Sequence, residues 1–372
     1  MEPSKSSMES MVMNWSSILE KNLSAKKVFI TGHTGFKGSW LTIWLQHYGC
    51  SISGYSLMPE SQPNLFEMSG LASGYVNHTV GDIRDGDRLA QSMRDSEPEL
   101  VLHLAAQPLV RYSYSSPAET WSTNVMGTVN VLEAVRQCPS VKAVVVVTTD
   151  KCYENKEWAW GYREIDPLGG HDPYSASKAG TELVVSSYRK SFFNQEGSPL
   201  IGSARAGNVI GGGDWSDDRL IPDAARAVAT NQSLMIRNPN STLPWQHVLD
   251  CLYGYLLLSA NLLDGNQTNS RAFNFGPSSN DNLPVGDMLA RLQQYWPELE
   301  WKCEKTENSS MLHEANFLYL DSMLARQQLN WEPRWTLNNA LEKTASWYRY
   351  VLENPSLAKN IIQQQLEEYL NT

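Results

Sequence analysis

Cysteine is scarce in this sequence, and the few thiols form no pattern. The 372 residues include 5 cysteines, with no Cys-x-x-Cys pair and no cluster of cysteine and histidine at zinc-site spacing. A sparse, odd set in a chain of this length is typical of reduced thiols. We therefore expect no disulfide framework, no bound metal and a cytoplasmic protein.

Long apolar runs are also missing. No stretch approaches the roughly 20 apolar residues that cross a bilayer. The longest candidate, around 252–263, is interrupted by Gly254, Ser259 and Asn261. The first 26 residues contain no apolar segment of signal-peptide length. We expect a chain that does not enter a membrane.

An excess of positive charge is absent as well. Acidic residues outnumber basic ones by 40 to 30, which gives a formal net charge of −10. A nucleic-acid-binding protein normally has the opposite balance, because its affinity comes from neutralising phosphates. We expect no nucleic-acid partner, although a local basic site for one diphosphate is compatible with this charge.

The apolar residues that are present are arranged for a parallel sheet. They make up 41% of the chain, enough for a full core, which excludes disordered and low-complexity classes. Strands that are apolar on both faces and alternate with helices indicate a sheet covered on two sides. The predicted fold class is α/β, a doubly wound parallel sheet of the Rossmann type with a smaller C-terminal substrate-binding lobe. Strands are expected at 28–30, 51–55, 75–80, 100–104, 141–148 and 200–205, and helices at 39–48, 85–94, 117–137 and 174–193.

The pattern changes after about residue 211, where proline, asparagine and tryptophan become frequent until about 282 and the remainder is helical. We therefore predict three parts. Residues 1–25 form an N-terminal extension with a short amphipathic helix, and 26–210 form a dinucleotide-binding domain. Residues 211–372 form mainly the substrate-binding lobe and return some segments to the first domain.

A glycine-rich turn, GHTGFKG at 32–38, follows the first strand and opens a helix. Glycines there allow a pyrophosphate to approach the backbone, and the helix N-terminus favours its negative charge. The expected ribose-binding acid some 20 residues on is missing at the strand end in 55–60, so NAD and NADP both stay open, and Lys37 could contact a 2′-phosphate. The turn predicts a dinucleotide site that contains Gly32, Thr34, Gly35, Phe36, Lys37 and Gly38.

Tyr174 and Lys178 are spaced i and i+4, which places them on one face of a helix. A neighbouring ammonium favours the phenolate and lowers the pKa of a tyrosine, so the phenol can act as base or acid near neutral pH. A surface pair is the alternative interpretation. The glycine turn upstream favours a catalytic pair.

Thr149, Asp150 and Lys151 follow the fifth strand, at the edge where open α/β sheets hold their ligands. Their hydroxyl, carboxyl and amine groups can all meet one substrate there. A capping loop is the alternative interpretation, and we predict a catalytic cluster.

Taken together, these motifs resemble the extended short-chain dehydrogenase/reductase family. Within it they are most similar to the branch of nucleotide-sugar 4,6-dehydratases that act on CDP-glucose. The likeness covers essentially 26–350 and is carried by VFITGHTGFKGSW (28–40), AAQPLVR (105–111), TNVMGT (123–128), TTDKCYEN (148–155), DPLGGHDPYSASKA (166–179), SARAGNVIGGGDW (203–215), RLIPD (219–223), PWQHVL (244–249) and HEAN (313–316).

The resemblance implies an internal redox cycle on a nucleotide-diphospho-sugar, with NAD as cofactor. Tyr174 and Lys178 would serve the oxidation at C4, with Thr149 hydrogen-bonded to the C4 oxygen. Asp150 would then protonate the leaving C6 hydroxyl. Lys151, where the related dTDP-glucose enzymes have Glu, would remove the C5 proton as a neutral amine. Hydride return to C6 gives the 4-keto-6-deoxy sugar.

The resemblance also implies binding residues and an assembly. For Asp82, the alternative role is that of a helix N-cap. For Arg219 and Arg237, the alternative is an ordinary surface charge. A homodimer is expected through helices 117–137 and 174–193. Further cofactor contacts are expected from Tyr55, Asp82, Ile83, Leu104, Ala105, Ala106, Thr123, Tyr174 and Lys178, and substrate contacts from Gln107, Arg111, Asn208, Arg219, Arg237 and His247.

One departure from the family pattern concerns the substrate. The family usually has Arg before Pro-Trp-Gln-His-Val, where its planar fork matches phosphate oxygens, and this chain has Leu243. The nucleotide base and the sugar therefore stay open. The alternatives are a 4,6-dehydratase of another nucleotide sugar and a nucleotide-sugar 4-epimerase.

Overall fold

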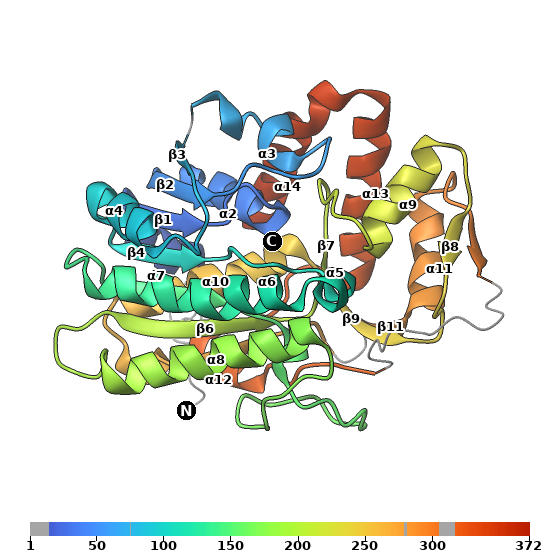
Figure 1. Ribbon diagram of the computed structural model, residues 1–372. Helices are drawn as coiled ribbons and strands as arrows, with labels where there is room; N and C mark the ends of the chain where they lie inside the picture. Colours follow the sequence, from blue (N-terminus) through green and yellow to red (C-terminus); the bar gives the residue numbers. More distant parts are fainter. Residues whose placement is uncertain (1–14, 75, 279–280, 305–316) are drawn as a thin grey trace, which may run out of the picture.

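A parallel sheet of seven strands forms the centre of the molecule, and helices cover both of its faces (Figure 1). The computed structural model describes residues 15–74, 76–278, 281–304 and 317–372. Residues 1–14 of the predicted extension, Tyr75 of a predicted strand and the HEAN segment 313–316 lie outside the described residues. The predicted doubly wound α/β fold is confirmed. The strand order is β10 (Ala272–Phe275), β6 (Leu200–Ala206), β5 (Ala143–Val147), β4 (Leu100–His103), β1 (Lys27–Thr31), β2 (Ser51–Ser56) and β3 (Asn77–Val80).

Two separate cores lie against the two faces of this sheet. Along β1, Val28 and Ile30 belong to the larger core, whereas Phe29 belongs to the other. Successive side chains of a strand point to opposite faces, so a run that is apolar at every position serves both. The larger core includes α2 (Phe36–His47) and α10 (Val248–Leu263), and the other includes α4 (Gly86–Ser96), α7 (Gly127–Arg136) and α8 (Pro173–Ser191).

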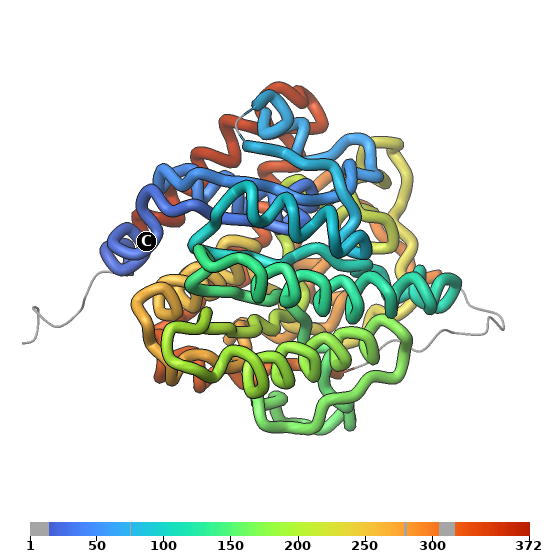
Figure 2. Tube along the Cα trace, turned by 60° about the vertical axis from the view of Figure 1, so that its left-hand side comes forward, coloured from blue at the N-terminus to red at the C-terminus, as the bar shows by residue number. Residues whose placement is uncertain are grey.

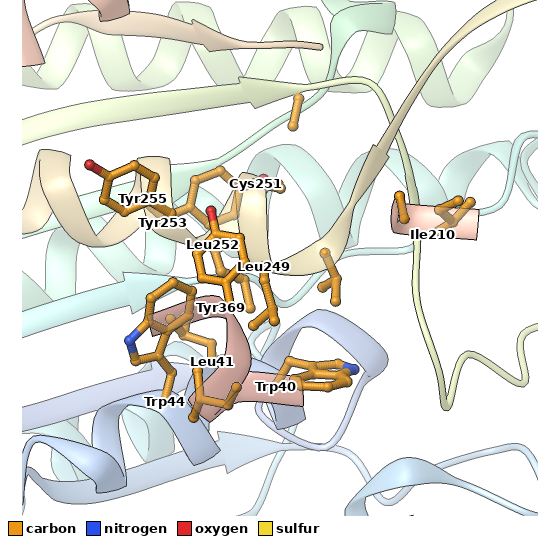
Figure 3. Packing of buried hydrophobic residues seen from close by; sticks show 14 of the residues in the cluster. Trp40, Leu41, Trp44, Ile210, Leu249, Cys251, Leu252, Tyr253, Tyr255 and Tyr369 are labelled. Atoms are coloured by element: carbon orange, nitrogen blue, oxygen red, sulfur yellow. The ribbon is translucent and has the colours of Figure 1, made fainter. Parts of the chain in front are cut away.

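The larger core joins the beginning, middle and end of the chain. Figure 3 shows Trp40 and Trp44 of α2 beside Leu252 of α10 and Tyr369 of α14 (Ala358–Leu370). All four side chains are fully buried, and each contributes roughly 1.5–3 kcal/mol through burial of apolar surface. Segments beyond residue 211 therefore belong to the core beneath the sheet.

The first helix, α1 (Trp15–Leu23), also packs on this core. Its Leu19 and Leu23 are fully buried, and the Trp15 ring lies 4.9 Å from the ring of Tyr253 on α10. Figure 2 shows the C-terminus next to this helix. The described part of the N-terminal extension thus covers α10.

A smaller lobe follows β6 and lies at the right of Figure 1. The expectation of a purely helical remainder after 282 is wrong, because two short strands occur there. Several strands of the lobe have only three residues, which is too few to show a period of two along the sequence. No helix in the described ranges is long and apolar enough to span a bilayer. The lobe contains α9 (Leu220–Ala229), α11 (Val285–Tyr295) and α13 (Leu337–Glu353), a sheet of β11 (Asn282–Pro284), β9 (Thr242–His247) and β7 (Asn208–Ile210), and a pair of β12 (Trp301–Cys303) and β8 (Leu234–Ile236).

Candidate active site

The candidate site lies at the carboxyl ends of the central strands. The strand order reverses between β1 and β4, and open α/β sheets bind ligands at such a reversal. Three segments reach this edge, namely the glycine turn 32–38 after β1, residues 104–111 after β4, and residues 148–153 after β5.

The glycine turn has no space for side chains at two of its positions. Gly32 has a φ of +77°, and a Cβ atom there would lie 2.6 Å from the backbone nitrogen of Ala105. A Cβ atom on Gly38 would lie 2.1 Å from the carbonyl oxygen of Gly32. Gly35 is the N-cap of α2 and offers no capping side chain. The first N–H groups of α2 are therefore available to an anion.

Three side chains of this turn contact the protein itself. The Thr34 hydroxyl lies 2.8 Å from the Ser56 Oγ atom and donates to the Leu57 carbonyl, which ties the turn to the end of β2. Phe36 packs against the larger core. Lys37 donates from Nζ to the Tyr255 Oη atom on α10 at 3.4 Å. The hypothesis that Lys37 contacts a 2′-phosphate therefore finds no support in its position.

Tyr55 lies near the end of β2, and Asp82 follows β3; both were predicted to contact the cofactor. Asp82 accepts hydrogen bonds from the backbone and guanidinium of Arg84, which hold the pKa of its carboxyl below the usual value. Asp85 is the N-cap of α4, so the N-cap alternative for Asp82 is wrong. The Tyr55 side chain is fully buried and donates to the Asp82 carbonyl. Any contact between Tyr55 and a cofactor would therefore involve its backbone, and the prediction that Tyr55 contacts the cofactor stays a prediction.

The segment that follows β4 contains small residues and a glutamine that is hydrogen-bonded to neighbouring residues. Leu104, Ala105 and Ala106 are half-buried. Thr123 is half-buried in the helical turn Ser122–Met126, and Ile83 packs where Gly127 has no side chain. The side-chain amide of Gln107 donates to Thr120 at 2.9 Å and to the Leu109 carbonyl. Gln107 therefore stabilises its own loop, and its predicted contact with a substrate stays a prediction.

Helix α8 carries Tyr174 and Lys178, and both side chains are at most 7% exposed. Burial raises the pKa of Tyr174 to about 12, while a hydrogen bond with Thr149 and the charge of Arg219 act in the opposite direction. Burial and the charge of Lys37 lower the pKa of Lys178 to about 8. The Lys178 Nζ atom lies 3.5 Å from a backbone oxygen at the end of β5. Burial therefore outweighs the charges that favour the phenolate, and the expected net lowering of the Tyr174 pKa is not seen.

Residues 149–151 form a tight polar cluster at the end of β5. The Asp150 Oδ1 atom accepts from Thr149 Oγ1 at 2.8 Å and from Lys151 Nζ at 3.5 Å. The Lys151 Nζ atom also donates to Asn208 Oδ1 at 3.4 Å. Asp150 is fully buried, and its Oδ2 atom has no hydrogen-bond partner among the described residues. A buried polar atom without a partner is costly and marks a candidate contact for a ligand.

The predicted substrate-binding arginines differ in their surroundings. Arg111 pairs with Asp218 at 3.2 Å, and Arg219 pairs with Asp214 at 3.2 Å. Arg219 is close enough to Tyr174 for its charge to favour the phenolate, whereas Arg237 is exposed after β8.

Leu243 lies in β9 directly opposite Leu283 of β11 and packs against the larger core. The position at which the family has an arginine is therefore part of an apolar contact in this chain.

His247 lies in the interior. It has no exposed surface, and its Nδ1 atom accepts from the backbone of Leu249 as the N-cap of α10. Its ring packs 4.6 Å from Trp335, and burial lowers its pKa to about 3. The prediction that His247 contacts the substrate is at odds with this position. Its place directly before the apolar run 248–263 was the available signal for a helix cap.

A buried ion pair that was not predicted from the sequence lies beside the site. Glu182 of α8 and Arg205 of β6 lie 2.8 Å apart. The only signal was their charge, which is unusual within an apolar strand and on the inner face of a helix.

A glycine turn after the first strand of a doubly wound sheet, with a buried Tyr/Lys pair on a helix beside the fifth strand, defines a short-chain dehydrogenase/reductase. The sequence profile described as GDP-mannose 4,6 dehydratase matches residues 29–344. The chain therefore belongs to the GDP-mannose 4,6-dehydratase family of nucleotide-sugar-modifying enzymes.

Two known relatives of the chain are nucleotide-sugar 4,6-dehydratases. The chain is 48% identical over 339 residues to a CDP-glucose 4,6-dehydratase of Salmonella typhimurium, covering 89% of this chain and 93% of that protein. It is 25% identical over 335 residues to a dTDP-glucose 4,6-dehydratase of Xanthomonas campestris, covering 86% and 92%.

Solved structures share the fold. An epimerase from Methanothermobacter thermautotrophicus matches with a TM-score of 0.78 at 21% identity, covering 93% of this chain and 98% of that one. A dTDP-glucose 4,6-dehydratase from Streptomyces venezuelae, solved with NAD and TYD bound, matches with a TM-score of 0.74 at 22% identity, covering 90% and 99%.

Proposed function

We propose that this chain is an NAD-dependent enzyme that converts CDP-glucose to CDP-4-keto-6-deoxyglucose with loss of water. The observation that carries this conclusion is the 48% identity over 89% of the chain to a CDP-glucose 4,6-dehydratase. The acid–amine pair of Asp150 and Lys151 beside Tyr174 supports dehydration, because a 4-epimerase needs no acid and base for C5 and C6. The substrate is a nucleotide-diphospho-sugar.

The glycine turn fits the pyrophosphate of NAD. Gly32 and Gly38 stand where a Cβ atom would collide with backbone, and the N-terminus of α2 favours the negative charge. We assign further contacts with the cofactor to Asp82 and to the small residues Ala105 and Ala106. When bound, NAD accepts a hydride from C4 of the sugar and returns it to C6.

We assign the oxidation at C4 to Tyr174, Thr149 and Lys178. Tyr174 takes the proton of the C4 hydroxyl, and Thr149 hydrogen-bonds the same oxygen. With a pKa of about 8, Lys178 is mostly protonated at neutral pH and acts as a hydrogen-bond donor. The charge of Arg219 favours the phenolate that the base needs.

Dehydration falls to Asp150 and Lys151. Their side chains lie 3.5 Å apart, so one proton that moves from the Lys151 ammonium to the Asp150 carboxylate produces both required forms. The neutral amine then removes the C5 proton, and the carboxylic acid protonates the C6 hydroxyl, which leaves as water. The buried Oδ2 atom of Asp150, which lacks a partner in the described structure, suits this contact with the substrate.

Incubation of the purified protein with CDP-glucose and NAD tests this function. The expected product has lost one water by mass spectrometry and carries a ketone at C4. An unchanged mass with an inverted C4 configuration identifies an epimerase. No change with CDP-glucose, and loss of water from another nucleotide sugar, moves the assignment to that sugar.

We further propose a homodimer, formed by the helical segments 117–137 and 174–193, which include α7 and α8. Trp121 and Met126 on the first of these helical segments and Leu183 on α8 are 43%, 53% and 61% exposed. Large apolar side chains on neighbouring helices suit an interface between copies. A cytoplasmic location is also proposed, supported by the five cysteines, which are all free thiols.

A further inference from the structure

A buried ion pair joins the two elements that carry the predicted catalytic residues. Glu182 of α8 and Arg205 of β6 are at most 4% exposed, and their side chains meet at 2.8 Å; the two elements run side by side in Figure 1. Burial of two charges is costly, and an apolar pair of similar volume is often at least as stable. Stability alone therefore does not explain the pair.

The carboxylate of Glu182 connects α8 to the end of β5 and to β6. Its Oε1 atom accepts from Thr148 Oγ1 at 2.5 Å, and its Oε2 atom accepts from Ser203 Oγ and Arg205 Nη2, both at 2.8 Å. Thr148 comes directly before Thr149. The carboxylate thus holds the first residue of the strand-end segment 148–153 to the helix.

The guanidinium of Arg205 holds the other end of this segment. Its Nη1 atom donates to Tyr153 Oη at 2.7 Å, and Tyr153 Oη donates in turn to Asn274 Oδ1 on β10 at 2.7 Å. The donors of a guanidinium form a rigid planar fork, so the contacts to Glu182 and Tyr153 are fixed relative to each other. The ion pair therefore anchors both ends of 148–153, and the acid and the amine of the site lie between the anchors.

Glu182 is also aligned with the active-site residues of its own helix. Tyr174, Lys178 and Glu182 follow one another at four-residue spacing, which places them on one face of α8. Burial and Lys37 lower the pKa of Lys178, and the charge of Glu182 acts in the opposite direction. The Glu182 carboxylate thus contacts segment 148–153 through Thr148 and acts on the charge of Lys178 in its own helix.

We propose that Glu182 and Arg205 are positioning residues for the dehydration. They hold segment 148–153 against α8 and so set the side chains of Thr149, Asp150 and Lys151 relative to Tyr174. This role rests on the proposed function, because that function assigns the proton transfers at C5 and C6 to Lys151 and Asp150 of this segment.

Two variants test the anchors separately, and a third serves as a matched control. Glu182→Gln keeps an acceptor for Thr148 but removes the charge that holds Arg205. Tyr153→Phe removes only the hydroxyl at the far anchor. The control is Glu133→Gln on α7, which removes the charge that pairs with Arg136 and keeps an acceptor for Tyr188 of α8. This control touches no residue of 148–153.

Each test variant is expected to lower kcat about 10- to 100-fold, the range that a misplacement of about 1 Å produces. The KM for CDP-glucose and the affinity for NAD are expected to stay unchanged. Amide hydrogen exchange in 148–153 is expected to become faster, whereas the control changes neither kcat nor this exchange.

A wild-type kcat, or wild-type exchange in 148–153, in the folded test variants overturns the proposal. If Glu182→Gln fails to fold, Tyr153→Phe decides alone, because it keeps the ring that stacks on Tyr162. Hydrogen exchange needs no substrate. A wild-type protein that leaves CDP-glucose unchanged therefore overturns the proposed function separately from the anchoring of 148–153.

Discussion

Substitution of Lys151 separates the oxidation at C4 from the proton removal at C5. The Lys151 Nζ atom is held by Asp150 and Asn208 at 3.5 and 3.4 Å, and its side chain is 24% exposed. Lys151→Met removes the amine and keeps most of the aliphatic chain. Loss of a positioned base is expected to lower kcat by about 10²–10⁴-fold.

The substitution is also expected to lower the stability of the fold. The Asp150 carboxylate is fully buried and accepts a hydrogen bond from Thr149 as well as from Lys151. A buried charge that loses its ionic partner costs up to about 3–5 kcal/mol. Activity is therefore compared well below the melting temperature of the variant, so that the loss of activity in folded protein reports on chemistry.

Deuterium exchange provides the assay. In heavy water, the wild-type product acquires deuterium at C5, which NMR or mass spectrometry detects. Lys151→Met is expected to reduce the cofactor partially in the presence of CDP-glucose, seen as nicotinamide absorbance, without exchange at C5. The matched control is Lys156→Met, which removes an exposed lysine paired with Glu154 on the same connection. Wild-type exchange at C5 in Lys151→Met refutes the role of Lys151 as the base.

Three further predictions concern the cofactor, the core and the assembly. Gly32→Ala places a side chain at a φ of +77°, which costs about 1–2 kcal/mol, and puts its Cβ atom 2.6 Å from the backbone nitrogen of Ala105. Calorimetric titration should show much weaker NAD binding. An unchanged affinity contradicts the role of the glycine turn in binding the pyrophosphate. Burial raises the pKa of Asp250 from 3.8 to about 6, so its contribution to stability is present at low pH and is lost as the pH rises through 6. The melting temperature of Asp250→Asn relative to the wild type should therefore fall as the pH is lowered from 7.5 to 5, and a constant difference argues against the raised pKa. Leu183→Glu should convert the dimer to a monomer by sedimentation analysis, and an unchanged sedimentation coefficient removes α8 from the interface.

The centre of the sheet was predictable because β1, β4 and β5 contain runs of consecutive apolar residues, which are a strong local signal. The strand β10 (Ala272–Phe275) was not predicted, because four residues are too few to show a clear pattern of hydrophobicity. Its place beside β6 depends on contacts between distant segments.

The site was predictable only where position along the chain fixes position in space. Thr149, Asp150 and Lys151 follow a strand, and the carboxyl ends of parallel strands share one edge of the sheet. The i, i+4 spacing placed Tyr174 and Lys178 on one helix, but it did not specify that the Lys178 ammonium turns to the end of β5.

Burial accounts for the errors. His247 matched a family segment, yet tertiary packing encloses it as a helix cap. Glu182 and Arg205 are ordinary charges in the sequence, and their pairing exists only once α8 lies on β6. Local patterns give no measure of how completely a side chain is enclosed.

Transfer of a label within one sugar tests the central claim most directly. CDP-glucose with deuterium at C4 is incubated with the enzyme and NAD in ordinary water, and the product is examined by NMR. The account predicts that the deuterium appears at C6 of a 4-keto-6-deoxy sugar. Deuterium that stays at C4, or that is absent from C6 of the dehydrated product, contradicts it.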